Sequence, residues 1–333
     1  MKALLVKTSS MGDVIHTFPA VTEALAKRPD LIIDWLVEES FVEVARLHPG
    51  VRKVIPVAVR RWRKGILRAE TRAEISGVRR ALRLETYDLV LDAQGLIKSA
   101  WLARFARRPI EGFDKRSVRE WPASLVYARG HTIAREGHAI DRTRRLFGAV
   151  FGYEPDLDQF ASGLEREGPG SDEVFLLHGT TWPTKRWPTG AWIDLARGLV
   201  ARGLVPVVTH ADPVEATVAE AIAAAVPGVV HLPKTRLGTL ADRLGRARGA
   251  VGVDTGLTHL AAAFGLPTVA LFSSTVPGLT GPMGRATEVI ASEAACAPCR
   301  QRTCRLTPGA AVLACHATMG ADRVLASIDR WAP

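Results

Sequence analysis

Hydrophobic residues along the first half of the chain follow two alternating patterns. Short continuous apolar runs predict strands over 3–7, 32–37, 52–57, 88–92 and 110–113. Between them, apolar positions three or four residues apart predict helices over 14–27, 40–47, 66–84 and 97–107, with further helix over 117–127 and 138–151. Short apolar runs separated by amphipathic helices are typical of strands buried in a parallel sheet.

The second half repeats the alternation after residues 154–172, a polar stretch rich in Gly and acidic residues that we interpret as a linker. Strands are predicted over 173–178, 205–209, 228–231, 250–253, 267–272 and 287–291, and helices over 190–202, 213–225, 237–247, 256–264 and 320–331. This alternation predicts an α/β fold of two doubly wound Rossmann-like domains facing across a cleft. We place them at 1–160 and 161–318, with 319–333 as a C-terminal helix that packs back on the N-terminal domain.

Length and composition agree with two domains and exclude several classes of protein. A chain of 333 residues is long for one hydrophobic core, because cores stop growing at roughly 250–300 residues. No run reaches the ~20 apolar residues of a membrane span, and the first ten residues, "MKALLVKTSS", are typical of a strand rather than a signal peptide. We therefore expect a cytoplasmic protein. Neither half has G-x-G-x-x-G after its first strand, and no P-loop occurs, which argues against dinucleotide oxidoreductases and P-loop enzymes.

Positive charge is concentrated in the first half of the chain. The net charge is +10, and residues 1–160 hold 28 Lys and Arg against 20 Asp and Glu, whereas residues 161–333 hold 16 against 14. Residues 52–83 alone have eleven basic side chains and two acidic ones. Such a field favours an anionic partner, which can be nucleic acid, anionic lipid or a phosphorylated sugar. The alternative is a solvated helix face without a ligand.

A polar turn follows the predicted strand 250–253, in the segment "VDTGLTHLAAA". Asp254, Thr255 and Gly256 lead directly into a helix, whose free N–H groups and dipole favour a bound phosphate. Thr258 and His259 can add side-chain donors on the same turn. The alternative is a capped helix with a buried histidine.

Two further turns follow predicted strands. In "LLHGTTWPTKRWP", His178, Thr180, Thr181 and Lys185 are expected near the 254–259 turn, where Lys185 would neutralise a diphosphate. In "LLVKTSSMGDVIHT", Asp13 lies at the carboxyl end of the first strand, where ligands bind in open α/β sheets. A helix N-cap is the alternative role for this carboxylate.

Five segments of the chain together resemble one enzyme family. "KTSSMGDVIHTFPAV", "RRWRK", "DAQGLIKSA", "TTWPTKRWP" and "VDTGLTHLAAA" are similar to the lipopolysaccharide heptosyltransferases of the GT-B superfamily, most closely those of type I. The resemblance covers both predicted domains. It implies inverting transfer of L-glycero-D-manno-heptose from ADP-heptose to the Kdo of Kdo2-lipid A, at the cytoplasmic face of the inner membrane, by a peripheral enzyme on an anionic surface.

The resemblance also implies roles for individual residues. Asp13 matches the catalytic base and Lys185 the diphosphate-binding lysine. The implied donor site comprises Thr180, Thr181, Lys185, Asp254, Thr255, Gly256, Leu257, Thr258 and His259. The implied acceptor site comprises Ser10, Gly12, Arg60, Arg61, Arg63, Lys64 and Arg119. We expect Trp62, within the basic segment, to contact sugar or lipid.

We expect a metal ion to have a structural role in this protein and no catalytic one. The one D-x-D sequence, Asp156-Leu157-Asp158, lies in the linker, so we expect no catalytic Mg²⁺ or Mn²⁺. All four cysteines, Cys296, Cys299, Cys304 and Cys315, fall within twenty residues near the end of the chain. In a cytoplasmic protein, clustered thiols beginning with C-x-x-C favour a structural metal, Zn or Fe, over disulfides. Free thiols or a disulfide are the alternatives.

Two other functions compete with this interpretation. A heptosyltransferase II, or another family member acting on a later core sugar, would share the same motifs. A basic nucleic-acid-binding protein would also account for the charge, but the 52–83 segment has few aromatic residues for base stacking. We therefore expect no nucleic acid partner.

Overall fold

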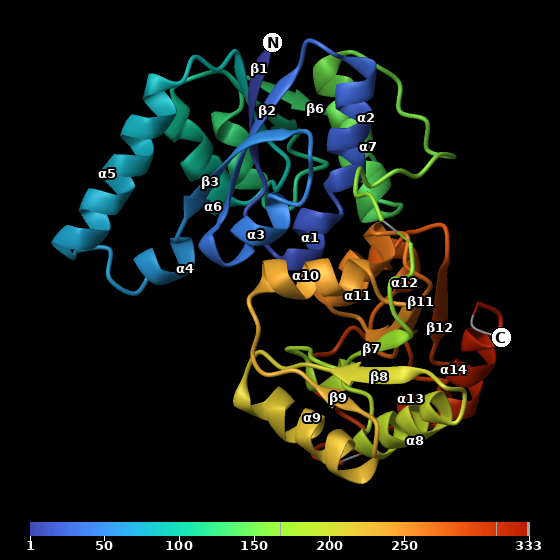
Figure 1. Cartoon of the computed structure of the whole chain (residues 1–333). Coiled ribbons are helices and arrows are strands. Elements are labelled where there is room, and N and C mark those ends of the chain that lie inside the picture. Colours follow the sequence, from blue (N-terminus) through green and yellow to red (C-terminus); the bar gives the residue numbers. More distant parts are fainter. Residues whose placement is uncertain (167, 311, 332–333) are drawn as a thin grey trace. The chain divides into compact units, whose positions relative to one another are not determined.

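The chain folds into two compact units, Met1–Leu164 and Glu165–Pro333. The computed structural model describes residues 1–166, 168–310 and 312–331. Figure 1 labels the helices and strands of both units along the chain. Within the described residues, each helix is too short or too polar to cross a bilayer.

Unit 1 contains a six-stranded parallel sheet in the order β3-β2-β1-β4-β5-β6. Its strands are β1 (Lys2–Val6), β2 (Ile32–Glu38), β3 (Val51–Val57), β4 (Leu89–Asp92), β5 (Ile110–Phe113) and β6 (Arg129–His131). The first five agree with the predicted strands, whereas β6 was not predicted. Strands β2 and β3 follow β1 on one side of the sheet, and strands β5 and β6 follow β4 on the other, so the strand order reverses between β1 and β4. The carboxyl ends of these two neighbouring strands therefore form the crevice where such sheets bind ligands.

Helices connect the strands of unit 1. They are α1 (Met11–Ile15), α2 (Phe18–Lys27), η1 (Glu39–Phe41), α3 (Val42–Ala45), α4 (Val59–Trp62), α5 (Ala69–Leu84), α6 (Ile97–Ala103), η2 (Arg104–Ala106), η3 (Trp121–Val126) and α7 (Ala139–Phe151). The single helix predicted over 14–27 is in fact two, because the chain turns at His16 and Thr17 and Pro19 starts a new helix. Leu4, Val6 and Leu36 belong to a buried cluster between sheet and helices.

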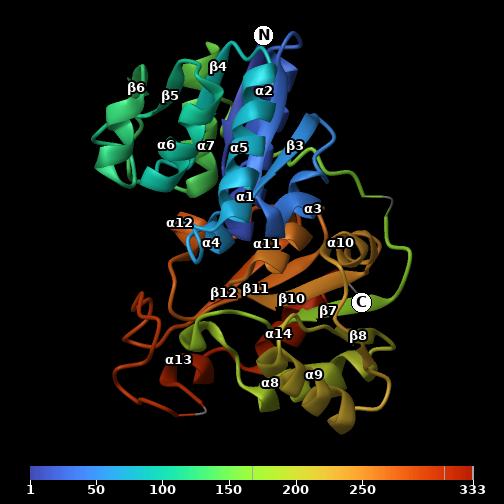
Figure 2. The same cartoon turned by 90° about the vertical axis from the view of Figure 1, so that its left-hand side faces the viewer.

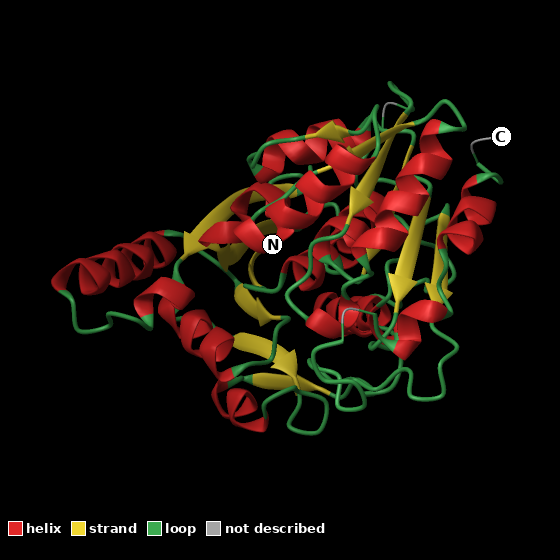
Figure 3. Cartoon of the chain, turned by 90° about the horizontal axis from the view of Figure 1, so that it is seen from below, coloured by secondary structure: helices red, strands yellow, loops and turns green. Residues whose placement is uncertain are grey.

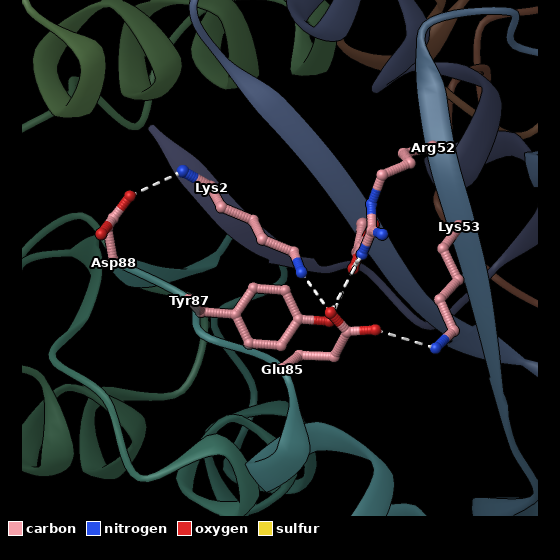
Figure 4. A network of polar contacts seen from close by, with 7 residues as sticks. Lys2, Arg52, Lys53, Glu85, Tyr87 and Asp88 are labelled. Carbon is pink, nitrogen blue, oxygen red and sulfur yellow. Dashed lines mark hydrogen bonds and ion pairs between the residues drawn. The ribbon is translucent and has the colours of Figure 1, made fainter.

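A polar network ties together the amino ends of the strands in unit 1 (Figure 4). Glu85, after α5, accepts bonds from Lys2 on β1 and from Arg52 and Lys53 on β3. These contacts lower the pKa of Glu85 to about 2, and the hydrogen bond from Lys2 is the largest cause. Burial acts in the opposite direction but is outweighed. The network therefore fixes the end of the sheet opposite the crevice, where it can serve stability rather than binding.

Unit 2 contains a second six-stranded parallel sheet, in the order β12-β11-β10-β7-β8-β9. Its strands are β7 (Glu173–Leu177), β8 (Val205–Val208), β9 (Val230–His231), β10 (Gly249–Val253), β11 (Thr268–Phe272) and β12 (Thr287–Ala291). Figure 2 shows β12, β11, β10, β7 and β8 side by side in that order. Here the switch in direction lies between β7 and β10. All six strands were predicted.

The helices of unit 2 complete its two layers around the sheet. They are η4 (Pro183–Lys185), α8 (Thr189–Val200), α9 (Pro213–Ala225), α10 (Leu237–Gly245), α11 (Gly256–Ala263), α12 (Pro277–Thr280), α13 (Ala314–Ala317) and α14 (Ala321–Ile328). Figure 3 shows the strands in yellow among the helices in red. The core of unit 2 is a cluster of buried apolar side chains from the strands and helices. Val174, Leu176 and Trp192 belong to it.

The C-terminal helix α14 packs against elements of unit 2. Leu325 of α14 lies against Gly198 of α8, and Trp331 lies over Gly249 at the start of β10. A Cβ at either glycine would collide with these side chains, so the small residues make room for the helix. These contacts of α14 are with its own unit, and the expected packing on the N-terminal domain stays a prediction. Residues 332 and 333 of the predicted 319–333 segment lie outside the described residues.

Candidate active site

Asp254 is the most heavily engaged acidic residue at the switch point of unit 2. It directly follows β10, and its side chain is only 9% exposed. Oδ2 accepts a hydrogen bond from Thr275 Oγ1 at 2.6 Å and lies 2.6 Å from Lys185 Nζ. Oδ1 lies 3.5 Å from Nε2 of His259. The structure therefore brings Lys185 into contact with Asp254, which lies about seventy positions later in the sequence, beside Thr275 and His259.

The ionisation of Asp254 is set by these neighbours. Burial alone raises the pKa of this carboxyl, but the hydrogen bond from His259 and the charge of Lys185 outweigh it, so the pKa lies well below its usual range. Asp254 is thus a carboxylate at neutral pH. Its negative charge holds the Lys185 ammonium and the His259 ring near the first turn of the helix that follows, Gly256–Ala263.

The loop after β7 delivers Lys185 to this position. Lys185 ends the short helix η4, and its ammonium lies 4.8 Å from the centre of the Trp182 ring. Ser273 donates to the carbonyl of Thr184, whose hydroxyl donates to the carbonyl of Gln301 at 2.6 Å. These buried bonds hold the loop from both sides, which pre-organises the lysine.

Helix α11 begins directly beside the Lys185–Asp254 pair. Its N-cap is Thr255, in extended conformation, and Thr255, Gly256 and Leu257 are half-exposed. The first N–H groups of a helix have no partner within the helix, and they carry the positive end of its dipole. Free N–H groups and an ammonium group in this arrangement are chemically suited to an anion such as a phosphate.

Thr258 differs from its predicted role. Its side chain is fully buried and donates to the carbonyl of Val253 at 2.7 Å, under the turn. A Cβ at Gly252 would lie 2.0 Å from this hydroxyl, so the glycine is needed for the close approach. The hydroxyl of Thr258 therefore shapes the turn and is not a donor to a ligand.

The loop after β7 contains three other residues that were predicted to lie at the site. Two of them are at least partly exposed, and the third is buried in the core. Thr180 is half-exposed, with its hydroxyl 3.5 Å from the carbonyl of Asp254, and Thr181 is exposed. His178 is instead buried beside Trp192, and burial lowers its pKa to about 4. We therefore correct the expectation that His178 joins the mouth of the site.

The switch point of unit 1 is built around a glutamine that the sequence analysis did not single out. Gln94, just after β4, accepts hydrogen bonds at Oε1 from Thr8 N (2.6 Å), Thr8 Oγ1 (2.8 Å) and Ser9 N (3.2 Å). Its amide also donates to the carbonyl of Ser9. Gln94 is 8% exposed, so these bonds are shielded from water. One side chain thereby fixes the turn that leads from β1 into α1.

Asp13 lies in the first turn of helix α1, and its side chain is bonded to Ser10, which directly follows the Thr8–Ser9 turn. Its Oδ2 accepts from the backbone N–H of Ser10 at 2.7 Å and from the Ser10 hydroxyl at 3.0 Å. The carboxylate is half-exposed at the carboxyl end of β1. The N-cap of α1 is Ser10, and Asp13 completes the capping box from the third position of the helix, so the N-cap role considered for Asp13 is corrected. Its role at a ligand site stays a prediction.

Two lysines near Asp13 were not predicted. Lys7 directly follows β1 and donates to the carbonyl of Ala93, while Lys98 in α6 donates to Ser9 Oγ at 2.8 Å. Burial lowers the pKa of both ammonium groups, and the charge of Asp13 opposes this in each case. Their signal in the sequence is weak, because only the pairing of β1 with β4 brings them to one place.

The basic segment 60–64 contains residues in different environments. Arg61 is paired with Glu39 at 3.1 Å and Glu74 at 2.9 Å. Trp62 is 3% exposed and donates to Glu74 at 2.7 Å, so the expectation that it contacts sugar or lipid is corrected. The remaining basic residues of the predicted acceptor site are exposed: Arg60, Arg63, Lys64 and Arg119.

The predicted metal residues do not form a ready site. Cys315 is buried, Cys296 and Cys304 are half-buried, and Cys299 is exposed. Burial and then the neighbouring Cys296 raise the pKa of Cys315, whereas the Thr307 hydroxyl lowers the pKa of Cys304. In residues 1–166, 168–310 and 312–331, no three His, Cys, Asp or Glu side chains are arranged to hold an ion.

The D-x-D sequence lies in an exposed loop, as expected. The N–H of Asp156 donates to Glu23, and its carbonyl accepts from Arg144. Asp156 and Asp158 are both exposed, and they sit in the segment that follows α7 rather than at the end of a strand. Their contacts therefore fasten the end of unit 1.

Comparison with known proteins identifies relatives along nearly the whole chain. The sequence model described as "Glycosyltransferase family 9 (heptosyltransferase)" matches residues 75–309. Lipopolysaccharide heptosyltransferase 1 of Pseudomonas aeruginosa is 44% identical over 92% of this chain and 88% of the relative. The protein of the same name from Escherichia coli K12 is 42% identical over 86% of this chain and 92% of its own.

Solved structures agree with the sequence relatives. The structure of "E. coli heptosyltransferase WaaC with ADP" superposes with a TM-score of 0.88 at 36% identity, covering all of both chains. That of WaaC with ADP-2-deoxy-2-fluoro heptose gives 0.84 at 36% identity, covering 99% of each. The parallel sheets, the two switch points and these relatives lead to one conclusion: the chain is a GT-B enzyme that belongs to glycosyltransferase family 9, the heptosyltransferases.

Proposed function

We propose that this enzyme transfers L-glycero-D-manno-heptose from ADP-heptose to the Kdo of Kdo2-lipid A, with inversion, in lipopolysaccharide core biosynthesis. The observation that carries the proposal is the Lys185–Asp254 pair at the start of α11, which suits a nucleotide diphosphate. The names of the relatives support the heptose and the type I acceptor. The WaaC structures with ADP and with a fluorinated ADP-heptose support the donor.

Unit 2 supplies the groups that the leaving diphosphate needs. As the bond between the anomeric carbon and the phosphate oxygen breaks, negative charge grows on the diphosphate. Lys185 and the first N–H groups of α11, from Gly256 and Leu257, stabilise that charge. Thr180, Thr181, Thr255 and His259 complete the donor site, and Asp254 positions Lys185 and His259.

Unit 1 supplies the base. The acceptor hydroxyl attacks the anomeric carbon, and its proton goes to the carboxylate of Asp13. Ser10 and Gly12 form the turn around this carboxylate, and the amino groups of Lys7 and Lys98 lie close enough to interact electrostatically with it. For transfer, the acceptor hydroxyl bound by unit 1 must contact the anomeric carbon of the donor bound by unit 2. No metal takes part in this scheme.

The acceptor carries carboxylates on Kdo and phosphates on lipid A, which fits the exposed cations of unit 1. Arg60, Arg63, Lys64 and Arg119 are the residues we assign to it, whereas Arg61 is occupied by two glutamates. Because the acceptor is a membrane lipid, we place the enzyme at the cytoplasmic face of the inner membrane, bound peripherally.

A structural metal at Cys296, Cys299, Cys304 and Cys315 is a separate proposal. The thiols would have to move together to ligate one ion, because they are not arranged as ligands in the described chain. Elemental analysis of protein purified without added metal tests it. One Zn or Fe per chain, lost in Cys315→Ala, would support a site that braces the 296–315 segment. Metal-free, fully folded protein would contradict it.

The decisive test of the transfer reaction separates the two roles of Asp13. Asp13→Asn keeps an oxygen that accepts from the Ser10 N–H but cannot take a proton, while Ser10→Ala removes one bond to the carboxylate and leaves the base. Turnover of ADP-heptose with Kdo2-lipid A should fall by 10²- to 10⁴-fold in Asp13→Asn, and donor binding should persist. Ser10→Ala should remain active. Full activity of Asp13→Asn would refute the base assignment.

The same assay distinguishes the type of heptosyltransferase. Type I predicts a product with Kdo2-lipid A that bears no heptose. If only the singly heptosylated acceptor reacts, the enzyme is of type II or acts on a later core sugar.

A further inference from the structure

A second cationic surface of unit 1 lies apart from the residues assigned to substrates. It is a groove of about 670 Å³ between the end of α5, helices α6 and η2, and the segment that follows η3. Five arginines line it: Arg79, Arg83, Arg104, Arg107 and Arg108. No Asp or Glu is among the lining residues, all of which the structure describes. We call this surface the arginine groove.

In the part of the chain that the structure describes, the arginine groove has no counterions of its own. None of the ion pairs formed by described residues involves these five side chains, in contrast to Arg61 or Arg52. Arg104, Arg107 and Arg108 are exposed. Like charges this close repel one another, so the groove costs free energy unless an external anion neutralises it.

Backbone geometry at Arg107 also favours a role for its side chain. Arg107 has φ of 54°, in the left-handed region where glycine is preferred over residues with a Cβ. It caps the end of η2 at a position where glycine would relieve this strain. The fold itself therefore does not require arginine here.

One exposed apolar side chain lines the groove, and two others lie next to lining residues in the sequence or in the same short helix, which indicates the class of anion. Leu84, at the end of α5, is 79% exposed, Leu125 in the wall of the groove is 72% exposed, and Trp121 in the same short helix is 61% exposed. Exposed leucines and a tryptophan beside arginines are typical of surfaces that lie at a membrane interface, with cations at the phosphates. Figures 1 and 3 show α5 at the outer margin of unit 1.

The aromatic rings of the groove argue against single-stranded nucleic acid. The Arg79 guanidinium lies 4.5 Å from the centre of the Phe105 ring and 5.9 Å from that of Trp101. Phe105 is buried. A nucleic-acid groove needs free ring faces on which bases stack, and here these rings are engaged by Arg79 or by the core.

We propose that the arginine groove, with Leu84, Leu125 and Trp121, docks the enzyme on a bilayer containing anionic phospholipid. The phosphates of the headgroups neutralise the arginines, and the apolar side chains enter the interface. This docking surface is separate from Asp13 and from the predicted acceptor residues, and its test needs neither donor nor acceptor. Its failure is therefore distinguishable from failure of the proposed transfer reaction.

The test compares two triple variants of the full chain with the same loss of charge. The groove variant is Arg104→Gln, Arg107→Gly and Arg108→Gln, and the control variant is Arg46→Gln, Arg145→Gln and Arg285→Gln, at exposed arginines outside the groove. Co-sedimentation with vesicles of phosphatidylglycerol and phosphatidylcholine measures binding. Each arginine near an anionic surface contributes about fivefold in affinity, so the groove variant should bind about a hundredfold more weakly. The control should lose less than tenfold.

Two further measurements make the outcome decisive. Thermal unfolding should show the groove variant as stable as the parent, because Arg107→Gly relieves a left-handed residue. Activity on a water-soluble acceptor lacking acyl chains should be unchanged. Equal vesicle binding by both variants would overturn the proposal, as would loss of activity on the soluble acceptor, which would make the groove part of the acceptor site. A parallel loss of oligonucleotide binding that exceeds the loss for vesicles would assign the groove to nucleic acid instead.

Discussion

Nζ of Lys185 lies 2.6 Å from Oδ2 of Asp254, and the same oxygen accepts a hydrogen bond from Thr275 at 2.6 Å. The lysine follows β7 and the aspartate follows β10, two strands that are neighbours in the sheet. The side chains are 16% and 9% exposed. The pair therefore stabilises the turn after β10, and it also fixes the ammonium group that we propose binds the diphosphate.

Removal of Lys185 should damage both stability and donor binding. Lys185→Met leaves the Asp254 carboxylate buried without its cation, which we expect to cost about 3 kcal/mol of unfolding free energy. The double variant Lys185→Met with Asp254→Asn should recover most of that stability, yet bind ADP at least tenfold more weakly than the parent. Denaturant unfolding and calorimetric titration with ADP measure the two effects. Normal ADP affinity in the double variant would exclude Lys185 from the donor site.

The buried His178 should make the protein less stable in mild acid. Burial lowers its pKa to about 4 in the folded state, against about 6.5 when unfolded, so the unfolded chain binds the proton more readily. The stability associated with neutral His178 is complete above pH 6.5 and is lost as the pH falls toward 4. Between pH 7 and pH 5 we expect a loss of about 2 kcal/mol from this residue.

His178→Phe tests this pH dependence. A phenyl ring keeps the edge contact with Trp192 and cannot take a proton. The variant should lose less stability than the parent between pH 7 and pH 5 in denaturant titrations. A residual dependence should remain, because burial also lowers the pKa of His48 to about 4. Identical slopes for parent and variant would show that His178 is not the group responsible.

Gln94 should matter for turnover beyond its contribution to folding. Gln94→Ala leaves the N–H groups of Thr8 and Ser9 without their acceptor, which we expect to cost about 2 kcal/mol. Because those groups hold the turn that carries Asp13, kcat should fall more than tenfold while ADP affinity stays normal.

Tyr87→Phe is the matched control for Gln94→Ala. It removes the hydrogen bond to Asp34, at 2.8 Å, from the opposite end of the same sheet. This variant should also be destabilised, but its kcat should stay within about twofold of the parent. If both variants lose turnover in proportion to stability, Gln94 has no positioning role.

Neighbouring arginines in the basic segment should differ in their effect on acceptor use. Arg60 is exposed and stacks over Phe41 at 5.3 Å, whereas Arg61 is held by Glu39 and Glu74. Arg60→Ala should raise KM for Kdo2-lipid A severalfold and leave KM for ADP-heptose unchanged. Arg61→Ala should have the smaller effect, and a larger one would contradict the assignment. Steady-state kinetics with each substrate varied in turn decides between these outcomes.

Local patterns were sufficient for most of the secondary structure. Of the twelve strands among the described residues, eleven were predicted, because buried parallel strands have continuous apolar runs. The exception is β6, Arg129–His131, which is short and largely polar and forms only by pairing with β5 at the edge of the sheet. The break between α1 and α2 was missed because the apolar spacing continues across His16 and Thr17.

Candidate residues on turns after strands were also visible in the sequence. Asp13, Lys185 and Asp254 each follow an apolar run, and the parallel fold places such turns at one edge of a sheet. The sequence could not tell which hydroxyl or ring faces outward. Thr258 and Trp62 were assigned to ligands, but both side chains are buried and bonded to other residues of the protein, Val253 and Glu74.

The sequence alone determined the alternation of strands and helices, the class of fold and the family, since these depend on periodicity and on motifs within short segments. Tertiary structure alone decided that Gln94 holds the Thr8–Ser9 turn, that Lys7 and Lys98 lie near Asp13, and that five arginines share one groove. These relationships join residues tens of positions apart. They arise from strand order and side-chain packing, which no local pattern encodes.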